Sequence, residues 1–387
     1  MLQELSVDIV HKRNARISRI AVSALFFLSG LCFASWASRI PDIQQALGLN
    51  DAGLGSVLLA LPVGSIISLP VAGMLVSRFG SKQVLIIAAT AYGALLPLLG
   101  LATAPWELIM ILVFFGFFGN LTNIAMNTQA VAVEAMYGRS IMASFHGLWS
   151  VAGFTGAAIG TAMNGLHISI VYHFLLITAI AWTIILLAMR RIVPHDTNLQ
   201  ANQPMFARPD MFLLTLGIIA MCSMICEGTM FDWSGVYFRR VVQVRDGLSG
   251  AGYAAFMSTM AAGRFVADKI TTKLGVKKML LISGILTATG LMIAVIFPYF
   301  ISATLGFMLV GAGVSAVVPL IYSAAGKSKV LSPGMALATV STIGYLGFLF
   351  GPPLIGFVAQ ATSLAVSFTM IALMGAAIAV MSARIKL

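Results

Sequence analysis

Charged side chains are scarce in this sequence. Its 387 residues include 23 lysines and arginines and 12 aspartates and glutamates, so 9% of the chain is charged. A soluble domain of average composition has about 25% charged residues, whereas 59% of this chain is hydrophobic. The composition excludes a soluble globular protein and predicts an integral membrane protein.

Cysteines and catalytic motifs are equally few. The 3 cysteines, Cys32, Cys222 and Cys226, all fall within apolar runs, and their spacing offers neither a disulfide framework nor a metal site. The sequence contains no phosphate-binding P-loop, no HExxH motif and no GxSxG motif. We therefore predict no metal, no cofactor and no enzymatic activity.

Long apolar runs are what the chain has in abundance. They extend over about twenty residues, the length of a membrane-spanning helix, and lack the alternation of a barrel strand. The predicted fold is an all-α integral membrane protein with twelve transmembrane helices. These helices are expected near residues 17–37, 53–77, 82–103, 106–133, 140–163, 169–190, 212–238, 249–271, 278–298, 302–325, 334–358 and 364–384.

Lysine and arginine are distributed unevenly between the two sides of the membrane. With the N-terminus inside, 18 of them fall on the cytoplasmic side and 4 on the outer side, which is the positive-inside pattern. We expect a multi-pass protein of the bacterial inner membrane with both termini in the cytoplasm. The net charge of +11 then reflects topology and contact with anionic lipid, so no nucleic-acid partner is expected.

The sequence divides into two similar halves. The longest hydrophilic segment, residues 191–210, has six predicted helices on each side, and RFGSK at 78–82 recurs as KLGVK at 273–277. This offset of 195 residues indicates an internal duplication, and paired bundles of this kind rock against each other around a central site. The predicted domains are an N-terminal six-helix bundle over 1–190, a cytoplasmic linker over 191–211 and a C-terminal six-helix bundle over 212–387.

Both copies of this motif carry a family resemblance. GMLVSRFGSKQVL at 73–85 resembles the motif between the second and third helices of the major facilitator superfamily, and GRFVADKITTKLGVKK at 263–278 resembles its second-half copy. The resemblance implies a transporter built from two pseudo-symmetric six-helix bundles. The family motif has an acid where this chain has Ser77, so another group is expected to supply that gate contact, while Asp268 remains near the corresponding place in the second copy.

Other segments, among them FFLSGLCFASWASRIPDI, NIAMNTQAVAVE and SFHGLWSVAG, resemble the bacterial branch that includes the fucose permease. This resemblance implies proton-driven uptake of a sugar. Two positions depart from it, because Ala37 and Asn123 stand where that branch has acids in its first and fourth helices. Coupling is then expected at Glu227 or His146, or transport is uncoupled or driven differently.

Glu227 and His146 are the candidates for proton coupling because an ionisable group at membrane depth is costly and points to function. Glu227 lies about fifteen residues into its predicted helix, near the midplane at about 1.5 Å per residue. His146 lies in the fifth predicted helix, close to Trp149. The alternatives are a structural carboxyl that bonds a neighbouring helix and a packed histidine.

Amide side chains form a stripe on the fourth predicted helix. Asn120, Asn123 and Asn127 fall within about 60° of one another on a helical wheel, and amides suit a solute rich in hydroxyl groups. The alternative is hydrogen bonding between helices. Aromatic rings that can stack on a sugar accompany them. The predicted substrate-binding residues are Asn120, Asn123, Asn127, His146, Trp149, Trp36, Glu227 and Tyr345.

Charged residues near helix ends are candidate gates. We expect Arg39 to pair with Asp232 on the outer side, or to extend alone into the interface, and Glu134 to form a cytoplasmic latch with nearby arginines. The i, i+4 spacing of Arg264 and Asp268 favours a structural pair at the inner gate. The gating candidates are Arg39, Asp232, Arg78, Glu134, Arg139, Arg264 and Asp268.

These features predict a secondary active transporter of a small polar solute. A sugar or sugar derivative is favoured, carried by alternating access with proton symport, and the protein is expected to be a monomer in the bilayer. The first alternative is an exporter of amphipathic drugs or metabolites, which Met- and Phe-rich walls would suit. A receptor that binds a solute without moving it is disfavoured because the chain lacks the long soluble domain of a sensor.

Overall fold

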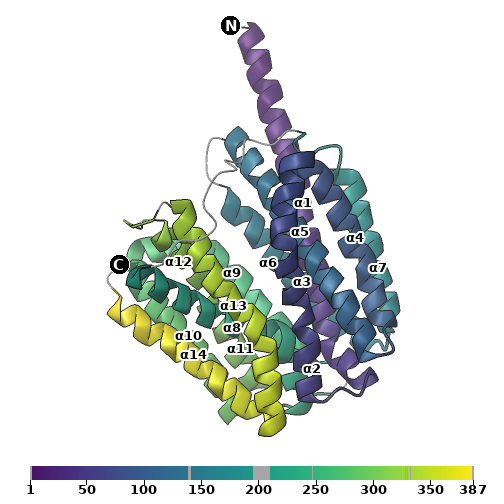
Figure 1. The fold of residues 1–387 in the computed structure, drawn as a ribbon, viewed down its shortest axis with the longest axis vertical. Coiled ribbons are helices and arrows are strands. Elements are labelled where there is room, and N and C mark those ends of the chain that lie inside the picture. The colour runs from purple at the N-terminus through teal and green to yellow at the C-terminus, as the bar shows by residue number, and fades with distance from the viewer. Residues whose placement is uncertain are drawn as a thin grey trace. The chain divides into compact units, whose positions relative to one another are not determined.

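The structure, a computed structural model, describes residues 2–137, 141–194, 210–245, 247–326, 328, 330–331 and 333–385. Within the helices, the side chains of residues 2–13, 143, 268, 333–335 and 338 lie outside this description. The described part forms 14 helices and no strand (Figure 1). The helices are α1 (Leu2–Ala46), α2 (Asp51–Leu58), α3 (Ala60–Phe79), α4 (Ser81–Leu101), α5 (Pro105–Tyr137), α6 (Met142–Gly165), α7 (Ile170–Ala188), α8 (Met211–Arg240), α9 (Ala251–Leu274), α10 (Val276–Ile296), α11 (Phe300–Val314), α12 (Val317–Ala325), α13 (Pro333–Ala361) and α14 (Leu364–Arg384).

These helices account for twelve membrane spans. Within the described residues, 10 segments are long and apolar enough to cross a bilayer, and two of them join a pair of helices, α2 with α3 and α11 with α12. Helices α6 and α9 have 24 residues each, which is also enough to span at about 1.5 Å per residue. The predicted all-α fold with twelve transmembrane helices is confirmed.

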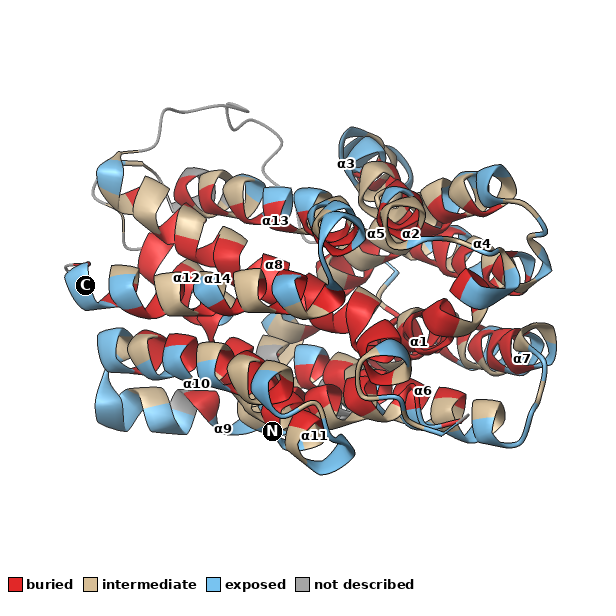
Figure 2. Cartoon of the chain, turned by 90° about the horizontal axis from the view of Figure 1, so that it is seen from below, coloured by how far each residue is buried: buried red, intermediate tan, exposed pale blue. Residues whose placement is uncertain are grey.

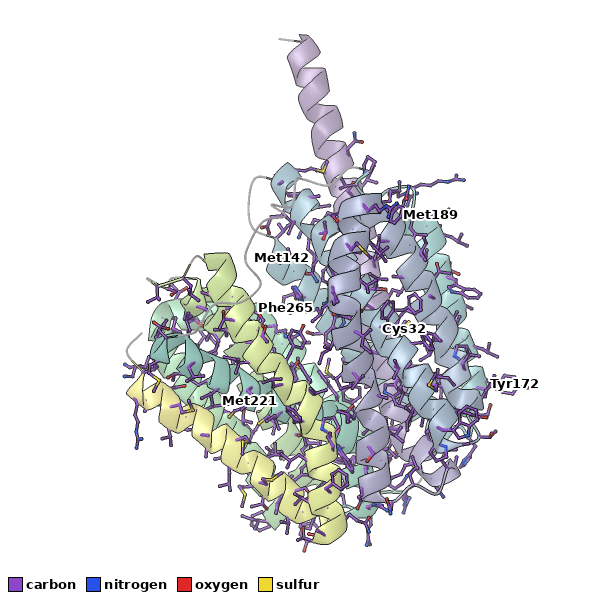
Figure 3. The ribbon with its side chains drawn as sticks, viewed as in Figure 1. Cys32, Met142, Tyr172, Met189, Met221 and Phe265 are labelled. Atoms are coloured by element: carbon purple, nitrogen blue, oxygen red, sulfur yellow. The ribbon has the colours of Figure 1, made fainter. Side chains whose placement is uncertain are left out.

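The outward faces of the helices are apolar. Exposed residues follow these faces, whereas α8 is buried along most of its length (Figure 2). The exposed side chains include large hydrophobic ones such as Ile87, Leu187 and Leu373, and Tyr172 on α7 points away from the helices around it (Figure 3). Such a surface is stable in contact with lipid and not with water.

The chain forms two compact units, and unit 1 comprises Met1–Trp36, Ala60–Gly156 and Ile168–Gln200. In it, α5 packs against α3 and α4, and α4 packs against α7. Helices α3 and α5 meet at Gly64 and Gly116, where an added Cβ would lie 1.9 Å from the Val113 carbonyl oxygen and 2.0 Å from the Leu61 carbonyl oxygen. Only glycine permits this close approach of two backbones.

Unit 2 comprises Ala37–Leu59, Ala157–His167 and Ala201–Leu387. It therefore includes α2 and the C-terminal ends of α1 and α6 together with helices α8 to α14. Helix α8 packs against α13, α14, α12 and α9, and α10 packs against α14 and α11. The predicted domain boundaries at 190 and 212 stay a prediction, and residues 195–209 of the predicted linker lie outside the described residues.

Two turns at equivalent places in the two halves have the same backbone conformation. Gly80 joins α3 to α4 with φ 80° and ψ 149°, and Gly275 joins α9 to α10 with φ 81° and ψ 155°. A positive φ of this kind favours glycine. The two repeats of the sequence motif thus form the same turn at equivalent places, 195 residues apart.

Candidate functional site

An ion pair lies inside unit 2, between α8 and α9. Nη2 of Arg264 donates to Oε1 of Glu227 at 3.2 Å, and Glu227 is 7% exposed. The sequence predicts a pair between Arg264 and Asp268, but the side chain of Asp268 is outside the described residues. The partner of Arg264 within the described residues is Glu227, which the sequence predicts as a proton-coupling group. The two opposite charges cancel, which lowers the cost of placing each at membrane depth.

Three phenols from different helices of unit 2 interact electrostatically with the carboxylate of this pair. Tyr253 on α9, Tyr322 on α12 and Tyr345 on α13 all lie within electrostatic reach of the Glu227 carboxylate. The hydroxyl of Tyr322 is hydrogen-bonded to Ser341, whereas Tyr345 is 42% exposed and keeps an open ring face. An ion pair with hydroxyl groups within electrostatic reach can bind a polar solute or exchange a proton.

Asp232 follows Glu227 on α8 but has a different environment. It is half-buried, and within the described part of the chain it forms no hydrogen bond or ion pair. The sequence predicts a contact with Arg39, and this pairing is wrong. Arg39 instead forms an ion pair with Asp42 at 2.9 Å, one turn further along α1.

Asp42 is the centre of a second charged cluster in unit 2, at the C-terminal ends of α1, α6 and α8. Its carboxylate accepts hydrogen bonds from Arg39, from Arg239 and, at 2.9 and 2.7 Å, from Nδ2 of Asn164. Asp51, the first residue of α2, pairs with Arg240. Several charges that share partners in this way hold helix ends together better than isolated surface pairs do.

The amide stripe of α5 splits into two parts in unit 1. Nδ2 of Asn120 donates to the Ser65 carbonyl at 2.9 Å and to Oγ of Ser68 at 2.7 Å, so this residue bonds α5 to α3, which is the alternative considered for it. Nδ2 of Asn127 donates to the carbonyl and to Oδ1 of Asn123, at 2.8 and 2.9 Å. Asn123 and Asn127 are both half-buried and have lone pairs left for a solute.

His146 and the predicted aromatic residues differ in accessibility. His146 is exposed on α6, with its ring at 5.3 Å from the ring of Phe26 in an edge-on contact. Trp149 is half-buried and lies beside Phe33. Trp36 is 1% exposed, so this structure offers no ring face for the stacking role that the sequence predicts.

Glu134, predicted to pair with arginines in a cytoplasmic latch, contacts backbone N–H groups in the structure. Oε2 of Glu134 accepts hydrogen bonds from the backbone N–H groups of Ile141 and Met142, at 2.7 and 2.9 Å. A carboxylate in this position caps the N-terminus of α6 and interacts favourably with the helix dipole. Arg78 is exposed and lies over the ring of Phe79, and Arg139 lies outside the described residues.

Sequence reasoning missed several residues of these sites. Gln129 is fully buried and uses its whole amide, donating to Ser81 and to the Val193 carbonyl and accepting from the Val193 N–H. Tyr253 is 1% exposed and carries no motif that could reveal it. Asp42 offers a signal, because it is an acid that directly follows the first predicted helix, whereas two arginines end the seventh.

Neither a metal site nor a disulfide occurs within the described residues. No group of three or more His, Cys, Asp or Glu side chains there could hold a metal ion. The thiols of Cys32, Cys222 and Cys226 are free and buried, and Figure 3 shows Cys32 among the helices of unit 1. The side chains described in these clusters are carboxylates, amides, hydroxyl groups, guanidinium groups and one imidazole.

Comparisons with known proteins agree over nearly the whole chain. The family model described as Major Facilitator Superfamily matches residues 22–329. An uncharacterized MFS-type transporter of Yersinia pestis is 36% identical over 356 residues, which cover 92% of this chain and 92% of that protein. The membrane protein MosC of Rhizobium meliloti is 32% identical over 369 residues, or 94% of this chain and 89% of that protein.

Solved structures of transporters have the same fold. The nucleoside transporter NupG superposes with a TM-score of 0.72 at 14% identity, over 95% of this chain and 99% of that chain. A bacterial homolog of the human lysosomal transporter Spinster, in an inward-facing and unoccupied conformation, superposes with a TM-score of 0.73 at 13% identity, over 95% of this chain and 96% of that chain. At these identities the likeness shows the fold alone.

Proposed function

Because the chain belongs to the major facilitator superfamily and is a membrane transporter of that type, we propose that it carries a sugar or sugar derivative together with a proton. Transporters of this family are not enzymes, and they act on small molecules. We further propose that it works as a monomer in the bacterial inner membrane, with both termini in the cytoplasm, because its basic residues follow the positive-inside rule.

The observation that carries the proposal is the ion pair between Glu227 and Arg264. A carboxylate at membrane depth is costly and is therefore a candidate for a functional role. Pairing with a guanidinium gives this carboxyl group two stable protonation states. In one state it is ionised and bound to Arg264, and in the other it is protonated and released from Arg264. A transporter whose conformations favour different states of this carboxyl binds a proton on one side and releases it on the other.

The proposed solute is uncharged and rich in hydroxyl groups. In unit 1, Asn123 and Asn127 offer amide oxygens and N–H groups without charge. In unit 2, the exposed ring of Tyr345 separately suits stacking on a sugar. Resemblance to the fucose-permease branch supports a sugar, and the fold shared with a nucleoside transporter makes nucleosides, which are sugar derivatives, worth testing. His146 is the second proposed contact for a solute hydroxyl.

Counterflow in proteoliposomes tests this function. Purified protein is reconstituted and loaded with labelled hexoses, amino sugars or nucleosides, and exchange is measured with and without an inward pH gradient. The proposal expects exchange for at least one solute, and accumulation only when the gradient is present. Exchange without any effect of the gradient would overturn proton coupling, and absence of exchange across the panel would overturn the sugar assignment.

Glu227→Gln separates coupling from binding. We expect this variant to keep exchange and to lose gradient-driven accumulation, because glutamine fills the same volume but takes no proton. The matched control is Glu107→Gln, since Glu107 is half-buried at the start of α5, where its carboxylate accepts a hydrogen bond from the Thr103 backbone N–H. The coupling assignment fails if Glu227→Gln accumulates solute as the control does.

A further inference from the structure

Helix α8 carries two acids away from its ends, Glu227 and Asp232. Glu227 and Arg264 neutralise each other at 3.2 Å. Asp232 stands on the same helix, five residues further on, which rotates it by about 140° and moves it by about 7.5 Å. A half-buried carboxylate that lacks a partner within the described residues is costly when ionised, and uptake of a proton removes that cost.

The hydroxyl of Tyr253 is the second observation. Tyr253 is 1% exposed, and its hydroxyl has no hydrogen-bond partner within the described residues. Its ring contacts Phe231 on α8 at 6.0 Å in an edge-on arrangement, and its oxygen lies within electrostatic reach of Asp232 and of Glu227. A buried phenol that lacks a partner needs an acceptor, and the Asp232 carboxylate can serve as that acceptor when the two groups come within hydrogen-bond distance.

Few other titratable groups can serve Asp232. Among the described side chains on the helices packed against α8, these groups are Tyr253, Arg264, Lys269 and Lys273 on α9, Tyr322 on α12, Tyr345 on α13 and Arg384 on α14. Arg264 is paired with Glu227, Lys269 and Lys273 lie near the end of α9, and Arg384 is the last residue of α14. The end of α1 also packs here, with Pro41 against Gly235, but its Arg39 is paired with Asp42.

We propose that Asp232 and Tyr253 form a proton-binding site of this transporter, with the Asp232 carboxylate as the base and the Tyr253 hydroxyl as its hydrogen-bonding partner. The proposal rests on the proton-coupled function proposed above and adds a second acid to it. The proton comes from water and bonds to a carboxylate oxygen, which converts the carboxylate to a neutral carboxylic acid. The same oxygen loses the proton to water when the site opens to the other side.

The position of Asp232 on α8 agrees with this role. It lies eight residues before Arg240, the last residue of the helix, or about 12 Å along the axis at about 1.5 Å per residue. Asp232 therefore stands between the helix end and Glu227. Tyr253 lies within electrostatic reach of both carboxylates, and the proposal assigns it the role of a positioning residue between them.

Infrared difference spectroscopy tests the site without any solute. Protein reconstituted in liposomes is cycled between acidic and alkaline buffer, and the carbonyl stretching band of protonated carboxylic acids is recorded. We expect Asp232→Asn to remove one band and Tyr253→Phe to shift that band to higher frequency, because a hydrogen bond to the acid is lost. The matched control is Asp210→Asn, since Asp210 caps the start of α8 and asparagine caps equally well.

Three outcomes would overturn the proposal. The first is a spectrum of Asp232→Asn identical to that of the control, and the second is a band of Asp232 that Tyr253→Phe leaves in place. The third is loss of the band at constant pH when sodium chloride replaces choline chloride, which would make the site one for Na⁺. If Asp232→Asn does not fold, Asp232→Glu provides the comparison and is expected to move the band. Since no solute is present, failed counterflow would refute the transport proposal and leave this result standing.

Discussion

Removing the guanidinium of Arg264 while Glu227 stays in place is expected to cost more stability than removing both charges. Loss of one partner from a buried ion pair costs about 3–5 kcal/mol, whereas replacement of the whole pair is often nearly neutral. This pair has one contact at 3.2 Å, and the Arg264 side chain is 21% exposed. We therefore expect about 2–3 kcal/mol for Arg264→Met, and about 1 kcal/mol or less for the double variant with Glu227→Gln.

The chain carries its own probe for this measurement. Cys32, Cys222 and Cys226 are free and buried, so a thiol-reactive dye labels them only when the protein unfolds. Heating the detergent-solubilised protein with the dye gives a melting temperature for each variant. The expected loss for Arg264→Met corresponds to a decrease of about 2–4 °C in melting temperature, and the double variant is expected to recover most of it.

A third variant checks that the effect belongs to the pair. Arg16 is exposed on α1, so Arg16→Met makes the same substitution at a surface site and is expected to change stability by about 0.5 kcal/mol or less. If the melting temperature of Arg264→Met equals or exceeds that of the double variant, Arg264 does not stabilise the Glu227 carboxylate. The ion pair would then contribute nothing to stability. The proposal that the Glu227 carboxyl alternates between an ionised state bound to Arg264 and a protonated, released state would be refuted.

Three further substitutions test the packing and the polar contacts by the same thermal assay. Gly64→Leu is expected to lower the melting temperature strongly because its Cβ would lie 1.9 Å from the Val113 carbonyl oxygen, whereas Gly73→Leu, with nothing within 4 Å, is the tolerated control. Asn120→Leu is expected to lose about 1–2 kcal/mol of stability with solute exchange intact, and loss of exchange at unchanged stability would instead make it a binding residue. Asp42→Asn is expected to make stability less dependent on salt, and an unchanged salt dependence would show that its charge contributes nothing.

The fold could be predicted from the sequence because the membrane imposes it. Apolar runs of about twenty residues have one stable structure in lipid, the helix. The repeat of RFGSK as KLGVK predicts the two equivalent turns at Gly80 and Gly275, and both take the same positive φ. Two predicted spans are each divided into two helices, α2 with α3 and α11 with α12. Hydropathy does not change at these breaks, so the sequence does not predict them.

The partners of polar side chains were harder to predict. A helical wheel places Asn120 and Asn127 on one face, yet one bonds a neighbouring helix and the other bonds its own helix. Likewise, the i, i+4 rule considers only partners of Arg264 on α9, and it could not predict that the tertiary packing brings Glu227 from α8 within 3.2 Å. Spacing along one helix says which residues share a face and nothing about which helix covers that face.

Proton movement on addition of solute tests the central claim most directly. Proteoliposomes in a weakly buffered medium receive a solute that counterflow has shown to exchange, and the external pH is followed with an electrode. The account predicts that the wild-type protein makes the medium more alkaline as solute enters, because each solute takes a proton with it, and that Glu227→Gln takes up solute without this change. Solute uptake by the wild-type protein at constant external pH would contradict the account.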